Sequence, residues 1–154
     1  MFRNKLFNFV TKYFDALESL FIVFLAVSLF LLIKEVKYSY YCVYAGLGLL
    51  AFLYWLMAIR PFEKKVAGIR IAIRRVVYVA YLLGCLSILA VLRFDYEVDP
   101  VPLVIASLVF LALAVILLLI KKYTMKEPKK VTANIIRCII FAVILIWLKF
   151  IMVI

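Results

Sequence analysis

Long uninterrupted runs of apolar residues, separated by short polar and charged segments, make up most of the chain. Within each run the apolar residues are continuous and do not alternate with polar ones, so the pattern favours helices over the strands of a barrel. A membrane-spanning helix needs about 20 predominantly apolar residues. The pattern therefore predicts five spanning helices. They cover residues 16–33, 40–59, 76–92, 101–120 and 135–154.

Composition supports lipid as the solvent of these runs. The chain has 154 residues, of which 70% are hydrophobic, whereas soluble domains are close to half apolar. A soluble fold of this size would expose large apolar patches to water. We therefore expect an all-α, polytopic integral membrane protein with a single transmembrane helical domain, residues 1–154. The first run is long and no small-x-small cleavage site follows it, so we expect a retained helix and not a cleaved signal peptide.

The links between the runs are short, and two of them carry helix-start signals. Residues 34–39 and 93–100 are too short to join anything but adjacent antiparallel helices. Asp99 followed by Pro100 predicts an N-cap and first turn for the fourth span. Thr132, which follows a turn at Pro128, is the expected cap of the fifth span.

Charge predicts the orientation. Fifteen of the nineteen lysines and arginines fall on the side of the N-terminus in this topology. Because cytosolic segments of membrane proteins are enriched in lysine and arginine, we expect the N-terminus inside and the C-terminus outside. A bacterial cytoplasmic (inner) membrane suits such a small, lysine-rich chain. The four basic residues on the other side are Lys34, Lys37, Arg93 and Lys149.

Two amphipathic segments accompany the spans. In the N-terminal segment, Phe2, Leu6, Phe9 and Tyr13 share one helical face, which predicts a short helix lying on the inner leaflet. Residues 60–77 combine an apolar stripe with basic residues on the other faces, the pattern of a basic interfacial helix. The residues of this helix expected to contact an anionic lipid or a partner are Lys64, Lys65, Arg70, Arg74 and Arg75.

Two other classes of ligand compete with lipid for this basic segment. A protein surface or a phosphorylated ligand is the second interpretation. A nucleic-acid reader would need a folded soluble module or interleaved stacking aromatics, but Phe62 is the one aromatic residue of the segment and membrane spans flank it on both sides. We therefore expect the anionic inner leaflet, and no nucleic acid, as the partner of the segment.

Catalytic signals are weak. The chain has no histidine, the commonest general base and metal ligand. Ser28, Ser87 and Ser107 therefore have no histidine to activate them. The three cysteines are scattered, which favours apolar packing over a disulfide framework. The span interiors carry few polar groups, so we expect no enzyme activity, no cofactor and no metal site.

One lysine lies inside the fifth span. Lys149 is about 7–8 Å along the helix axis from the C-terminus, at about 1.5 Å per residue. Its ammonium could reach the outer interface along its flexible stem. Alternatively, it faces the bundle as a buried charge and pairs with an outer acid, namely Asp95, Glu97 or Asp99.

Two acids open the first predicted span. Asp15 and Glu18 have i, i+3 spacing, and acids in a first helical turn complement the helix dipole. Pairing with the basic segments of the inner side is the alternative.

Small residues could set helix packing. Cys42 and Gly46 in the second span, and Ala80 and Gly84 in the third, have small-xxx-small spacing, which lets helix backbones approach closely. Packing within one chain is favoured over dimerisation.

Two classes of function fit this pattern. The first is a non-catalytic membrane component: an accessory or scaffold subunit, or a protective, immunity-type protein of a membrane assembly. Its expected partners are anionic lipids and another membrane protein or further copies of itself. The alternative is a small carrier, channel or lipid-moving protein that acts as an oligomer, because five thin spans enclose little polar volume.

Overall fold

The computed structural model describes residues 2–61, 68–92, 99–124 and 128–153, and the regular secondary structure in these ranges is entirely α-helical. Every helix is long enough and apolar enough to cross a membrane, which confirms the predicted number and type of elements. Lys64, Lys65, Asp95 and Glu97 lie outside the described residues. The helices are α1 (Phe2–Ile33), α2 (Ser39–Ile59), α3 (Gly68–Leu92), α4 (Val101–Thr124) and α5 (Pro128–Val153).

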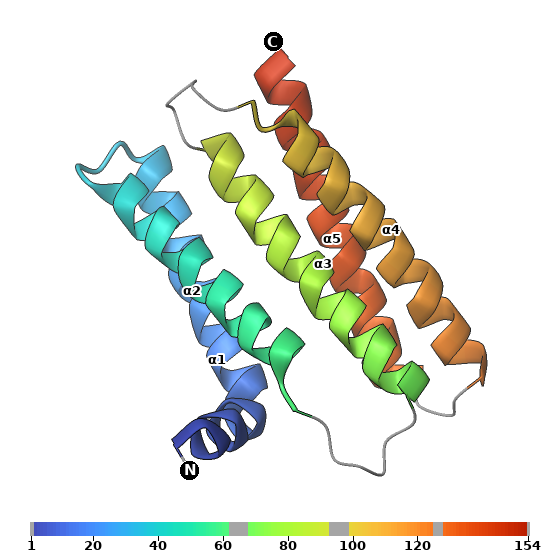
Figure 1. Cartoon of the computed structure of the whole chain (residues 1–154). Helices are drawn as coiled ribbons and strands as arrows, with labels where there is room; N and C mark the ends of the chain where they lie inside the picture. Colours follow the sequence, from blue (N-terminus) through green and yellow to red (C-terminus); the bar gives the residue numbers. More distant parts are fainter. Residues whose placement is uncertain (1, 62–67, 93–98, 125–127, 154) are drawn as a thin grey trace.

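Neighbouring helices run in opposite directions, so the two ends of the chain lie at opposite ends of the bundle (Figure 1). Helix α1 packs on α2, α2 on α3, and α3 on α4, while α5 packs against both α4 and α3. The two adjacent pairs expected from the short links, α1 with α2 and α3 with α4, are therefore present. Among the described residues, no Cα atom of α1 lies within 8 Å of a Cα atom of α5.

Three helices begin earlier than the apolar runs predict. Helix α1 begins at Phe2, α3 at Gly68 and α5 at Pro128, where the predicted spans begin at residues 16, 76 and 135. The apolar run marks the part of a helix that suits lipid. The backbone hydrogen-bonding pattern continues into the basic flanks, because lysine and arginine are good helix formers. The N-terminal amphipathic segment is thus the start of the longer helix α1, and residues 68–77 of the second segment are the first turns of α3.

The N-terminal turns of α1 bend away from the axis of the rest of that helix (Figure 1). Their buried residues are Phe7, Val10 and Phe14. The stripe predicted from the sequence lies on another face and is exposed, with exposed fractions from 37% to 82%. That stripe comprises Phe2, Leu6, Phe9 and Tyr13.

Helix ends test the two predicted caps. The backbone N–H of Val101 donates to Oδ1 of Asp99 at 3.0 Å, which confirms the cap of α4. The prediction for Thr132 is wrong, since α5 begins at Pro128 and Thr132 lies inside it. Proline suits a first helical turn because its missing N–H has no intrahelical acceptor there.

Close contacts join α2 to α1 and α3 to α5 at the two glycines singled out above. A Cβ at Gly46 would lie 3.2 Å from Cδ1 of Phe24 and 3.3 Å from Cδ1 of Leu25. A Cβ at Gly84 would lie 3.0 Å from Cδ1 of Phe141. The missing side chains therefore let these helices approach closely.

Buried hydroxyls link α3 to α4. The Oγ atoms of Ser87 and Ser107 are in hydrogen-bond contact with each other. The hydroxyl of Ser107 also lies 3.0 Å from the carbonyl oxygen of Leu83 on the facing helix. The hydroxyl of Ser87 lies 3.1 Å from the carbonyl of Leu103. The two serines therefore connect α3 to α4.

Candidate functional site

Glu18 is a buried acid in the middle of α1. Its side chain is 3% exposed, and it continues the buried stripe of Phe7, Val10 and Phe14 at helical spacing. A carboxylate removed from water is costly unless it is paired and hydrogen-bonded. The first-turn interpretation of Asp15 and Glu18 is wrong, because α1 begins at Phe2 and these acids lie in its interior.

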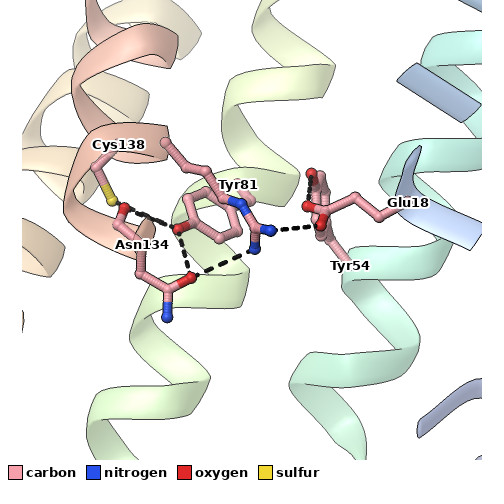
Figure 2. A network of polar contacts seen from close by, with 6 residues as sticks. Glu18, Tyr54, Tyr81, Asn134 and Cys138 are labelled. Atoms are coloured by element: carbon pink, nitrogen blue, oxygen red, sulfur yellow. Dashed lines mark hydrogen bonds and ion pairs between the residues drawn. The ribbon is translucent and has the colours of Figure 1, made fainter. Parts of the chain in front are cut away.

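Both carboxylate oxygens of Glu18 have partners from other helices. Nη2 of Arg137 on α5 lies 2.9 Å from Oε2, and the hydroxyl of Tyr54 on α2 donates to Oε1 at 2.8 Å. Figure 2 shows the carboxylate between these two donors. The side chain of Arg137 is 36% exposed, so the ion pair is buried on the acid side and partly open on the basic side. The alternative expected pairing with the basic segments of the inner side, whereas the partner of Glu18 is Arg137, which lies within the predicted fifth span.

The network continues through α5 to α3. Nη1 of Arg137 lies 3.5 Å from Oδ1 of Asn134. The hydroxyl of Tyr81 on α3 donates to the backbone carbonyl of Asn134 at 3.0 Å. The thiol of Cys138 donates weakly to the Tyr81 hydroxyl at 3.9 Å. Four helices, α1, α2, α3 and α5, thus meet in one polar network inside the bundle (Figure 2).

Aromatic rings surround the two tyrosines of this network. The ring centroids of Tyr54 and Tyr81 are 5.2 Å apart, and the ring of Phe141 stacks on Tyr81 at 5.6 Å. Phe14 meets Tyr54 at 6.4 Å. Rings at such distances are in favourable contact with one another, so aromatic side chains pack around the two tyrosines of the network.

The expectation that the span interiors hold few polar groups is therefore wrong at this depth. The network's groups nevertheless bind one another. Across the described residues, every buried side-chain nitrogen or oxygen has a hydrogen-bond partner. The same residues contain no cluster of three or more metal-ligating acids or cysteines. The arrangement is suited to holding helices together and to fixing their rotation.

Two adjoining cavities lie beside the network, at the end of the bundle that contains the starts of α3 and α5. The first has a volume of about 370 Å³ and lies between α3, α4 and α5. The second has a volume of about 450 Å³ and lies between α1, α3 and α5. Tyr78, Lys130 and Asn134 line both cavities.

The predicted basic contact residues are divided by the structure. Arg70 and Arg74 line the first cavity, and the Arg74 guanidinium lies 5.7 Å from the centroid of the Tyr78 ring. Arg75 is exposed and is not among the residues that line the cavity. Lys64 and Lys65 lie outside the described residues. The structure instead places Lys121 and Lys130, from α4 and α5, beside Arg70 and Arg74.

Lys149 is exposed on α5. Asp99 is one of the acids considered as its partner. In the part of the chain that the structure describes, Asp99 and Lys149 form no ion pair. The other two candidates, Asp95 and Glu97, are outside the described ranges. The exposed position fits the interpretation in which the ammonium reaches the interface.

Part of the polar network could have been predicted from patterns in the sequence. Glu18 lies four residues after Phe14, which itself follows Val10 by four, so a longer N-terminal helix would have placed the acid on the buried face. Asn134 and Arg137 stand one helical turn apart. Tyr54 and Tyr81 look like ordinary apolar span residues, and no local pattern marks their hydroxyls.

Family models, curated proteins and solved structures were all compared with this chain, and none matches it.

Proposed function

We propose that the protein is a non-catalytic multi-pass component of the cytoplasmic (inner) membrane, an accessory or scaffold subunit or a protective, immunity-type protein of a membrane assembly. The observation that supports this proposal is the closed polar network around Glu18. Its carboxylate oxygens are both taken by Arg137 and Tyr54. A reactive site would leave a nucleophile, acid or base facing a substrate, whereas these groups face one another.

The network also suits a protein that presents a fixed surface to a partner. Breaking a buried ion pair is costly, so the relative rotation of α1, α2 and α5 is held in place. The outer faces of the helices are apolar, as at Val109 on α4 and Val143 on α5, which are 60% and 59% exposed. In a membrane such faces meet lipid, another membrane protein or a second copy of the chain.

Purification in a mild detergent, followed by native mass measurement in lipid nanodiscs, tests this proposal. The expected result is a complex heavier than one chain, either with a defined second protein or as a homo-oligomer. A monomer in nanodiscs, with no protein recovered after crosslinking in intact membranes, would contradict the accessory role.

Orientation is part of the proposal. The N-terminal end of α1, the start of α3, the end of α4 and the start of α5 lie at one end of the bundle (Figure 1), and basic residues are concentrated there. The positive-inside rule then puts this end in the cytosol. Fusion of alkaline phosphatase or a fluorescent protein to the C-terminus distinguishes the two orientations. Phosphatase activity without fluorescence is expected, and the reverse would overturn it.

Anionic lipid is proposed to contact the basic face at the start of α3. Arg70 and Arg75 are exposed there, and each basic residue near an anionic surface contributes roughly 1 kcal/mol of attraction. A carrier, channel or lipid-moving oligomer is the second candidate function, and the cationic cavities favour it. Liposome assays of ion, solute and lipid transfer with purified protein test it, and absence of all three kinds of transfer removes it.

A further inference from the structure

Cationic side chains from three helices converge on the two adjoining cavities. They come from the start of α3, the end of α4 and the start of α5, so three segments of the chain line the two cavities. Four of the side chains, Lys121, Lys129, Lys130 and Arg137, belong to neither amphipathic segment. The cations that line the cavities are Arg70, Arg74, Lys121, Lys129, Lys130 and Arg137.

Few acidic side chains line the two cavities. Asp15 is the acid that lines the second cavity, and Glu18, above it, is already bound to Arg137. Within the described ranges, Arg70, Lys121 and Lys130 form no ion pair with a carboxylate. Like charges that lie close together repel one another, and a bound anion relieves this repulsion. The cavities are therefore suited to binding an anion.

Polar groups other than the cations point to the same ligand. The first turn of α5 forms part of the wall, since Lys129, Lys130 and Val131 line the cavities, and a helix N-terminus carries partial positive charge and free N–H groups. Asn134 adds a side-chain amide. In Figure 2 its nitrogen points away from Tyr81, which leaves this donor outside the Glu18 network.

We propose that the two cavities together form one binding site for a phosphate-bearing anion. Guanidinium and ammonium groups are the side chains that proteins use for phosphate. The walls behind them are apolar, with Ile73, Val77 and Leu118 all buried. A lipid with an anionic phosphate headgroup fits this combination, and a soluble phosphate compound shares its chemistry. The site requires neither the proposed orientation nor the accessory role.

Paired variants test the site against general surface charge. The cavity variant is Lys121→Gln/Lys130→Gln. The matched control is Lys5→Gln/Lys122→Gln, which removes the same charge at the same end of the bundle from two exposed residues that do not line the cavities. Each protein is placed in phosphatidylcholine nanodiscs containing increasing fractions of phosphatidylglycerol. Bound phosphatidylglycerol is then counted by native mass spectrometry after gentle release.

The expected result is a loss of phosphatidylglycerol affinity of about tenfold or more for each cation removed from the cavity, because a hydrogen bond to a charged group is lost. The control should lose less, at most about fivefold for each cation, because it removes surface attraction only. Equal losses in the two variants would overturn the proposal, because the attraction would then be general. No loss in either would overturn it as well. Lys121→Arg/Lys130→Arg keeps both charges and should retain binding, and circular dichroism and size exclusion verify that each variant folds.

Inorganic phosphate distinguishes the two sources of the ligand. If a lipid headgroup is the ligand, millimolar inorganic phosphate leaves the phosphatidylglycerol adducts unchanged. If a soluble phosphate compound is the ligand, inorganic phosphate raises the thermal stability of wild type in pure phosphatidylcholine nanodiscs, and the cavity variant loses this effect. If wild type forms no phosphatidylglycerol adducts and inorganic phosphate does not raise its thermal stability, the phosphate site is contradicted.

Discussion

Glu18 and Arg137 join α1 and α5, two helices whose Cα atoms do not approach within 8 Å of each other in the described residues. Nη2 of Arg137 lies 2.9 Å from Oε2 of Glu18, so long side chains span the distance between the two helices. The ion pair therefore closes the bundle between its first and last helices. Tyr54 and Asn134 hold the two partners from either side.

Replacing Arg137 by methionine should lower stability, because it leaves the Glu18 carboxylate buried without its cation. Breaking such a pair costs about 3–5 kcal/mol, and we expect the lower end because Arg137 is partly exposed. Thermal and denaturant unfolding in a fixed detergent measure the loss. Glu18→Gln/Arg137→Met should recover part of it, since no buried charge remains. A double variant as unstable as the single one would contradict a role for the charge.

Replacing Tyr54 by phenylalanine should remove one hydrogen bond to the carboxylate and keep the ring packing. Hydrogen bonds to charged groups contribute about 1.5–3 kcal/mol, so a loss near the lower value is expected in the same unfolding assay. Tyr123→Phe is the control, since Tyr123 is 86% exposed. In a Glu18→Gln background the effect of Tyr54→Phe should shrink, and an undiminished effect would show that the hydroxyl acts elsewhere.

Alanine substitution should distinguish the glycines by what lies opposite each one. At Gly84 the new methyl group meets the Phe141 ring, which is backed by Tyr81, so Gly84→Ala should cost about 1 kcal/mol or more through overpacking. At Gly48 there is no atom within 4 Å, so Gly48→Ala should be neutral or stabilising by up to about 1 kcal/mol. Gly46→Ala should fall between them, because its neighbour Phe24 is exposed and its contacts, at 3.2 and 3.3 Å, are longer than the 3.0 Å contact at Gly84. Equal stabilities of the three variants would exclude close packing at Gly84.

Removal of the Ser107 hydroxyl should weaken the contact between α3 and α4. Hydrogen bonds between membrane helices contribute on average about 0.6 kcal/mol, with a maximum of about 1.7, and Ser107→Ala should lose a value in this range. Ser28→Ala is the matched control, because the Ser28 hydroxyl donates to Phe24 within its own helix. A loss for Ser28→Ala equal to that for Ser107→Ala would mean that burial of a hydroxyl, and not the link between helices, sets the cost.

Local signals in the sequence predicted local structure well. The five apolar runs predicted five helices, and Asp99 with Pro100 predicted the start of α4, because a cap is formed by residues that are neighbours in the chain. Helix starts at Phe2, Gly68 and Pro128 were missed, since the hydropathy of a segment shows what solvent it suits and not where its backbone hydrogen bonds begin.

By itself, the sequence determined that this chain forms five long apolar helices with basic residues concentrated at one end, because hydropathy and charge are properties of each segment alone. The tertiary structure decided which face of each helix turns inward. It brought Glu18 to Arg137, and it gathered Lys121 and Lys130 with Arg70 at one cavity. These pairings depend on the rotation and order of the packed helices. Rotation and order arise from contacts between segments far apart in the chain, so no local pattern in the sequence specifies them.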